Sequence, residues 1–275
     1  MTRKTTYRTN FVYPQITESH YTFGVGKAPA KILREDGDWR DFVPPDEDQN
    51  RHGVESAACF VEANQRGIAT TQEEEYGIID QNYSARFNLM FAEATPYGGD
   101  PLKAAQSIRD HGMIPDSMLP FSDDIASWEE FNSYKGGSQK ACEAAGRLWR
   151  ERWDPRYGIV YRREMLPIEK YAALRQALKS GPVPMSVYAW EECDGGYYEK
   201  PAGVSDNHLT LCVYLDADNR PYWRDTYSPY LKVGTPFYNS DFAMQWTLEK
   251  LPEKPKKVSF LEMFIEIIKA LFKRK

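Results

Sequence analysis

Two neighbouring apolar runs in the last third of the chain constrain its fold most. His208 opens a β-branched run that ends at Leu215, turn-forming residues follow, and a second, aromatic run leads to Asp225. Runs of this kind, separated by a turn, are typical of two adjacent antiparallel strands. Such strands place His208 beside Asp225, as a general base oriented by a carboxylate requires. The alternative is a core histidine and a turn aspartate with no chemical role.

The composition indicates a globular protein that does not bind nucleic acid. The chain has 275 residues, enough for one large domain or two small ones, and 41% of them are hydrophobic. Its net charge is −5, and the small basic clusters lie at the termini. Nucleic-acid binding needs clustered lysine and arginine, so we expect no nucleic-acid partner.

The cysteines do not form a metal-binding or disulfide pattern. Cys59, Cys142, Cys193 and Cys212 lie far apart, and none belongs to a CxxC motif. We therefore expect no metal, no cofactor and a reducing compartment. The first eight residues lack an apolar secretory region, and the apolar stretch 258–272 is too short and too charged to span a bilayer comfortably. These features predict a soluble, cytoplasmic protein.

Helical patterns dominate the first half of the chain and strand patterns the second. This segregation predicts an α+β fold with a helical lobe, a β lobe and a cleft between them. After Trp246 the pattern thins out. The expected helices span 56–65, 82–94, 101–111, 128–153 and 167–179, and a strand is expected at 183–190.

Four segments make up the predicted organisation. They are an N-terminal arm (1–34), a main domain (35–250), a proline-rich charged linker (251–257) and an amphipathic C-terminal helix (258–275). The last helix either docks on its own domain or binds a protein partner or a surface. The arm is a candidate for an inhibitory segment that occupies the cleft.

Cys59 is the candidate nucleophile. It lies in the first turn of the helix expected at 56–65. The unpaired N–H groups of a helix N-terminus favour a thiolate there. A thiolate beside His208 completes the set of residues needed for nucleophilic catalysis.

Several motifs, in order, resemble the papain-like cysteine peptidases. Asp38-Trp39-Arg40 resembles the start of the mature domain, and Ala58-Cys59-Phe60 resembles the motif around the nucleophile. His208 follows Cys59 by 149 positions, near the upper end of the family's spacing of about 130–150. The resemblance covers residues 35–245. Its further landmarks are Gly98-Gly99, His111-Gly112, Leu119-Pro120-Phe121 and the helix, Gly-Pro-Val and strand segment 174–187.

The resemblance implies a two-lobed papain-like fold and a cysteine peptidase that hydrolyses peptide bonds in a protein or peptide substrate. It implies a triad of Cys59, His208 and Asp225, in which aspartate takes the place of the family's orienting asparagine. It also implies an oxyanion-binding glutamine, for which Gln49 is the candidate and Asn50 the fallback. No metal is implied.

Two departures from the family pattern leave an alternative open. The segment from Gln49 to Cys59 is longer than in papain, so the glutamine side chain could fall short of the site. In a second register Ala57 takes the nucleophile position. The chain is then a pseudoenzyme, or one whose cysteine has been replaced, and acts as a papain-like binding or virion-structural protein whose C-terminal helix docks to a partner.

A narrower resemblance concerns the source of the protein. Glu55-Ser-Ala-Ala-Cys59 and the segment 82–87 resemble a divergent branch of papain-like proteins in bacteriophage genomes. That resemblance implies a phage-encoded protein that lies in the host cytoplasm or the virion.

Overall fold

The computed structural model describes residues 11–17, 20, 31–79, 81–192 and 195–252. The predicted C-terminal helix (258–275), most of the linker and much of the arm lie outside the described residues. No helix within the described ranges is long and apolar enough to cross a membrane.

Most helices lie in the first half of the described chain and most strands in the second, as predicted, although β1 and β2 precede α1 and β3 precedes α6. The α-helices are α1 (Cys59–Tyr76), α2 (Ala85–Leu89), α3 (Pro101–His111), α4 (Trp128–Phe131), α5 (Gln139–Arg152) and α6 (Pro167–Leu178), with 3-10 helices at Arg40–Phe42 and Asp116–Met118. The strands are β1 (Asn50–Arg51), β2 (Val54–Glu55), β3 (Trp153–Tyr161), β4 (Val183–Val187), β5 (Glu191–Glu192), β6 (Tyr198–Glu199), β7 (His208–Leu215), β8 (Pro221–Arg224), β9 (Leu231–Val233) and β10 (Ala243–Lys250).

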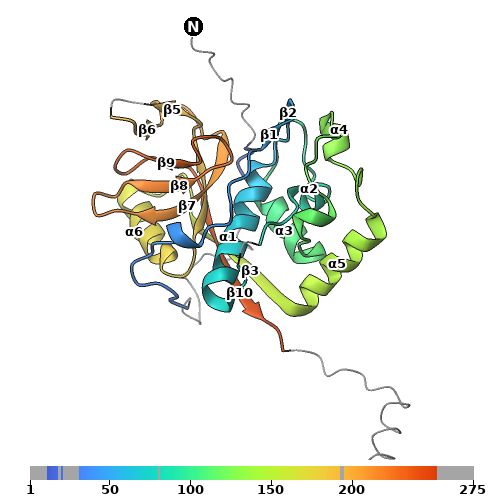
Figure 1. Ribbon diagram of the computed structural model, residues 1–275. Helices are drawn as coiled ribbons and strands as arrows, with labels where there is room; N and C mark the ends of the chain where they lie inside the picture. The colour runs from blue at the N-terminus through green and yellow to red at the C-terminus, as the bar shows by residue number, and fades with distance from the viewer. Residues whose placement is uncertain (1–10, 18–19, 21–30, 80, 193–194, 253–275) are drawn as a thin grey trace, which may run out of the picture.

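A six-stranded antiparallel sheet forms one side of the molecule, in the order β3-β10-β4-β7-β8-β9. Figure 1 shows helices α2 to α5 on the opposite side and α1 between them and the sheet. One large hydrophobic core joins the helices, including α1 and α3, to residues of β3, β7 and β10, and a second, the sheet-side core, joins α6 to the sheet. Trp39 anchors the sheet-side core, because its indole N–H donates to the carbonyl of Leu178 at 2.6 Å and the ring is fully buried.

Helix α1 is the central element, and it is longer than the segment predicted at 56–65. The helix ends where Gly77 adopts a left-handed conformation (φ 66°). Its residues are buried from Cys59 through Gln72, including many polar ones. The hydroxyls of Thr70 and Thr71 donate hydrogen bonds to carbonyls one turn earlier, so these side chains can be buried inside the helix. Because they are polar, they add nothing to an apolar periodicity in the sequence.

Three other expectations need correction. The helix predicted at 82–94 is only α2, and the 128–153 segment forms two helices, α4 and α5. The chain does not thin out after Trp246, because β10 continues to Lys250 and pairs along its length with β3. Trp246 and Leu248 are buried while Thr247 and Glu249 are less so, which is the alternation of a half-buried strand.

Candidate active site

His208 and Asp225 lie side by side, as the strand pattern predicts. His208 is the first residue of β7, and Asp225 directly follows β8, its antiparallel neighbour. The imidazole Nε2 lies 2.6 Å from Asp225 Oδ1, and both residues are fully buried. A buried hydrogen bond of this length fixes the ring orientation and the tautomer.

Cys59 faces the same imidazole from the start of α1. It is buried, and its side chain interacts with His208. The ring's Nδ1 is buried and makes no hydrogen bond with a described residue. Burial lowers the pKa of His208, but the charges of Asp225 and Cys59 and the hydrogen bond to Asp225 outweigh it and raise this pKa to about 10. The geometry therefore favours a protonated imidazole between two acidic groups.

A second cation binds the other side of Asp225. Lys232 Nζ donates to Asp225 Oδ2 at 2.7 Å, and both side chains are fully buried. Burial raises the pKa of Asp225, but the positive charges of His208 and Lys232 and their hydrogen bonds lower it below its usual value. Asp225 is thus a carboxylate held between two cations.

The side chain of Gln49 contacts Tyr227, whose ring lies next to His208. The extra residues fold into the hairpin of β1 and β2, in which Asn50 pairs with Glu55. Gln49 is fully buried and accepts a hydrogen bond from Thr226 Oγ1 at 2.6 Å. Its amide nitrogen donates to Glu55 Oε1 at 2.7 Å and to the Tyr227 hydroxyl at 2.5 Å. Both amide hydrogens are therefore engaged in this structure.

The two alternative positions lie elsewhere. Asn50 is exposed on β1 and has no contact with Cys59 or His208 among the described interactions. Ala57 precedes α1 in a left-handed conformation (φ 55°), and its backbone N–H donates to Glu55 Oε1. The structure brings Cys59, and not Ala57, to the imidazole.

Three residues around the site were missed from the sequence: Lys232, Glu55 and Tyr227. The Tyr227 ring centroid lies 5.5 Å from that of His208, and its hydroxyl donates to Glu55 Oε2 at 2.9 Å. Burial raises the pKa of Glu55, although hydrogen bonds from Tyr227, Ala57 and Gln49 oppose this shift. In the sequence, the lysine stands between the apolar residues Leu231 and Val233. This position was the one sign that Lys232 is buried and could pair with Asp225.

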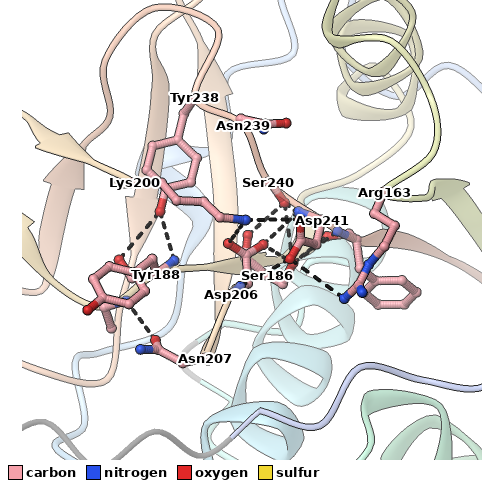
Figure 2. A network of polar contacts seen from close by, with 12 residues as sticks. Arg163, Ser186, Tyr188, Lys200, Asp206, Asn207, Tyr238, Asn239, Ser240 and Asp241 are labelled. Atoms are coloured by element: carbon pink, nitrogen blue, oxygen red, sulfur yellow. Dashed lines mark hydrogen bonds and ion pairs between the residues drawn. The ribbon is translucent and has the colours of Figure 1, made fainter. Parts of the chain in front are cut away.

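A polar network fixes the residues just before His208 (Figure 2). Asp206 Oδ1 pairs with Lys200 at 2.8 Å, and its Oδ2 accepts hydrogen bonds from the Ser186 hydroxyl and the backbone N–H of Asp241. Asn207 Oδ1 accepts a hydrogen bond from the backbone N–H of Ala189. The start of β7 is therefore tied to β4 and to the segment before β10.

The described part of the N-terminal arm bridges the two sides of the molecule next to this site. The backbone N–H of Phe11 donates to the carbonyl of Asn207 at 3.0 Å, and that of Val12 donates to the carbonyl of Gly99 at 3.1 Å. Asn207 precedes His208. Gly99 packs so closely on Phe60, the residue after Cys59, that a Cβ there would lie 2.4 Å from its ring.

The other described cysteines are packing residues. Cys142 and Cys212 are buried and unpaired. Burial raises the pKa of both thiols, that of Cys212 to about 12. Cys193 lies outside the described residues. No group of three or more metal-ligating side chains occurs among the residues described.

No family model matches the sequence, and no curated protein matches it significantly. Solved structures do match. Xylellain, a cysteine protease from Xylella fastidiosa, has a TM-score of 0.63 and 15% identity over 92% of this chain and 99% of its own. Digestive procathepsin L 3 of Tenebrio molitor has a TM-score of 0.56 and 15% identity over 83% of this chain and 73% of its own. The bromelain protease from Ananas comosus has a TM-score of 0.52 and 18% identity over 77% of this chain and 98% of its own.

All three similar structures are cysteine proteases. Their sequence identities with this chain are 15–18%, which shows a shared fold alone. The helical side, the antiparallel sheet side and α1 between them correspond to the predicted α+β arrangement. The chain therefore has the two-lobed fold of the papain-like cysteine proteases, as its sequence motifs predicted.

Proposed function

We propose that this protein is a cysteine peptidase that hydrolyses peptide bonds in a protein or peptide substrate. The observation that carries the proposal is the imidazole of His208, held by the Asp225 carboxylate at 2.6 Å and facing Cys59 at the start of α1. A nucleophile, its base and the group that orients the base are the constellation of nucleophilic catalysis.

The chemistry follows from the roles of these groups. The Cys59 thiolate attacks the peptide carbonyl carbon, and the carbonyl oxygen becomes an oxyanion. The His208 imidazolium then gives its proton to the leaving amine as the C–N bond breaks, which leaves a thioester on Cys59. His208, now neutral, takes a proton from a water molecule that attacks the thioester. The carboxylic acid product leaves and the thiolate–imidazolium pair is restored.

Selective alkylation tests the proposal directly. At mildly acidic pH an iodoacetamide-type reagent should modify Cys59 in preference to Cys142 and Cys212, because burial keeps those two thiols protonated. The E64 inhibitor, which is bound in the bromelain structure, should label the same residue. Peptide mapping by mass spectrometry locates the label and also resolves Cys193. The matched control is His208→Asn, which should remove the selectivity. Equal labelling of Cys59 in the parent protein and in His208→Asn would contradict the proposal.

One observation favours the alternative of an inactive binding or virion-structural protein. Both amide hydrogens of Gln49 are used by Glu55 and Tyr227, so the oxyanion donor is not free in this structure. If the alternative holds, Cys59 is alkylated selectively without any peptide being hydrolysed. A phage origin, a location in the host cytoplasm or virion, and a partner for residues 258–275 stay predictions.

The N-terminal arm is expected to limit access to Cys59. Two backbone hydrogen bonds hold it across the two lobes, and each contributes about 1 kcal/mol. Deleting residues 1–17 should therefore raise the population of open molecules, and with it the alkylation rate of Cys59, by roughly 10–30-fold.

A pair of point variants separates the hydrogen bond from the side chain. Val12→Pro removes the N–H that donates to Gly99, whereas Val12→Ala keeps it, and the Val12 side chain is 52% exposed. We expect faster alkylation in V12P than in V12A. Equal rates in these two variants and in the deletion would show that the arm does not cover Cys59.

A further inference from the structure

Lys232 is a fully paired buried cation at the base of the site. It lies in β9, and its side chain is completely buried. Its ammonium group donates to Asp225 Oδ2 at 2.7 Å, to the carbonyl of Tyr227 at 2.5 Å and to that of Pro229 at 2.6 Å. An ammonium group has three hydrogens, so all its donors are used and it has one position.

The two oxygens of Asp225 are divided between two cations. Oδ1 binds the imidazole of His208, and Oδ2 binds Lys232. This division prevents the carboxylate from rotating. It also makes the Asp225–Lys232 pair neutral overall, so the imidazole meets a carboxylate acceptor whose negative charge is offset by the ammonium group.

Lys232 also holds the loop that contacts Gln49, the candidate oxyanion donor. The two carbonyls it binds flank the turn after Asp225. That turn positions the Thr226 hydroxyl and the Tyr227 hydroxyl, both of which bind the side chain of Gln49. One buried ammonium group therefore fixes both the orienting carboxylate and the contacts of Gln49.

We propose that Lys232 is a positioning residue for the reaction, which holds Asp225 in the orientation that His208 needs and cancels its negative charge. The inference rests on the proposed peptidase function. The Asp225–Lys232 pair stabilises the imidazolium of His208 less than an unpaired carboxylate would. His208 can therefore still release its proton to the leaving amine.

Removing the lysine should shift the pKa of His208 in one direction. A positive charge near the imidazole disfavours the imidazolium, so losing Lys232 should raise the pKa of His208. Replacing Asp225 by asparagine should lower this pKa, because the carboxylate is lost while the lysine remains. The titratable and charged groups that act on His208, Asp225 and Lys232 from the surrounding elements are Cys59 and Arg66 of α1, Glu55 of β2, Asp48 before β1, and Tyr227.

The experiment measures the pKa of His208 by NMR titration of histidine labelled with ¹³C at Cε1. The full chain has four histidines, and His208→Asn assigns the signal. All variants carry Cys59→Ser, which removes the thiolate and makes the readout independent of activity. Failure of the peptidase proposal therefore leaves this test intact.

Two comparisons isolate the lysine. Lys232→Met should raise the pKa of His208 by about one unit or more relative to the Lys232 parent. The pKa of His208 should also be higher in the double variant Asp225→Asn/Lys232→Met than in Asp225→Asn alone, by a similar amount. The second comparison keeps the test valid if Lys232→Met leaves the carboxylate unpaired and does not fold.

The matched control is Lys170→Met, which removes another buried lysine, one that donates to the carbonyl of Ser240. This variant should leave the pKa of His208 unchanged. If neither comparison shifts the pKa upward, or if Lys170→Met shifts it as much, Lys232 has only a general structural role and the proposal is overturned.

Discussion

Replacing Cys59 with serine is expected to lower kcat/KM for peptide hydrolysis by about 10³-fold or more. The imidazole of His208 faces this side chain, and no other described cysteine contacts it. A serine hydroxyl is far more weakly acidic than a thiol, so the ion pair with His208 cannot form. The measurement is the initial rate of cleavage of a fluorogenic peptide library by purified protein.

Cys142→Ser is the matched control for this prediction. Cys142 is buried in α5 and lies 3.8 Å from the carbonyl of Met118, which a serine hydroxyl can also approach. This variant should hydrolyse the library within about twofold of the parent rate, as expected for a substitution away from the site. A Cys59→Ser protein with parental activity would refute the assigned nucleophile and would favour the register with Ala57 at the nucleophile position.

The histidine half of the site could be predicted from the sequence because its signal is local. His208 begins β7 and Asp225 directly follows β8, and these consecutive strands are joined by a short turn, so strand alternation and turn residues are sufficient to bring the two side chains together. The fold class followed from the segregation of helix and strand patterns in the same way. Helix α3, with Pro101 at its first position and Gly112 after its end, matched its prediction because capping signals are also local.

The rest of the site depends on contacts that are distant in sequence. Glu55 and Tyr227 are 172 positions apart, and neither has a periodic pattern that would identify it. The extra residues between Gln49 and Cys59 form the hairpin of β1 and β2, and the contact of Gln49 with Tyr227 spans 178 positions of sequence. The buried polar residues of α1 hid its length, because they give no apolar periodicity and their burial depends on the elements packed around the helix.

Replacing Gln49 with alanine is the second change with a large expected effect. Removing one oxyanion donor costs about 10²–10³ in kcat. In this structure the Gln49 amide donates to Glu55 and Tyr227, so the predicted oxyanion role requires it to exchange one of these acceptors for the oxyanion as charge develops on the substrate. A donor that acts only in the transition state lowers kcat and kcat/KM equally, so Q49A should change KM little.

Asn50→Ala provides a control with the same amide chemistry one residue away. The Asn50 side chain is exposed on β1, so its removal should leave kcat within about twofold of the parent. Steady-state kinetics on one peptide substrate decides between the two residues. A large loss of kcat in N50A with normal activity in Q49A would assign the oxyanion donor to Asn50 and would require the β1–β2 hairpin to rearrange on substrate binding. Equal and small effects in both variants would leave the backbone N–H groups at the start of α1 as the oxyanion donors.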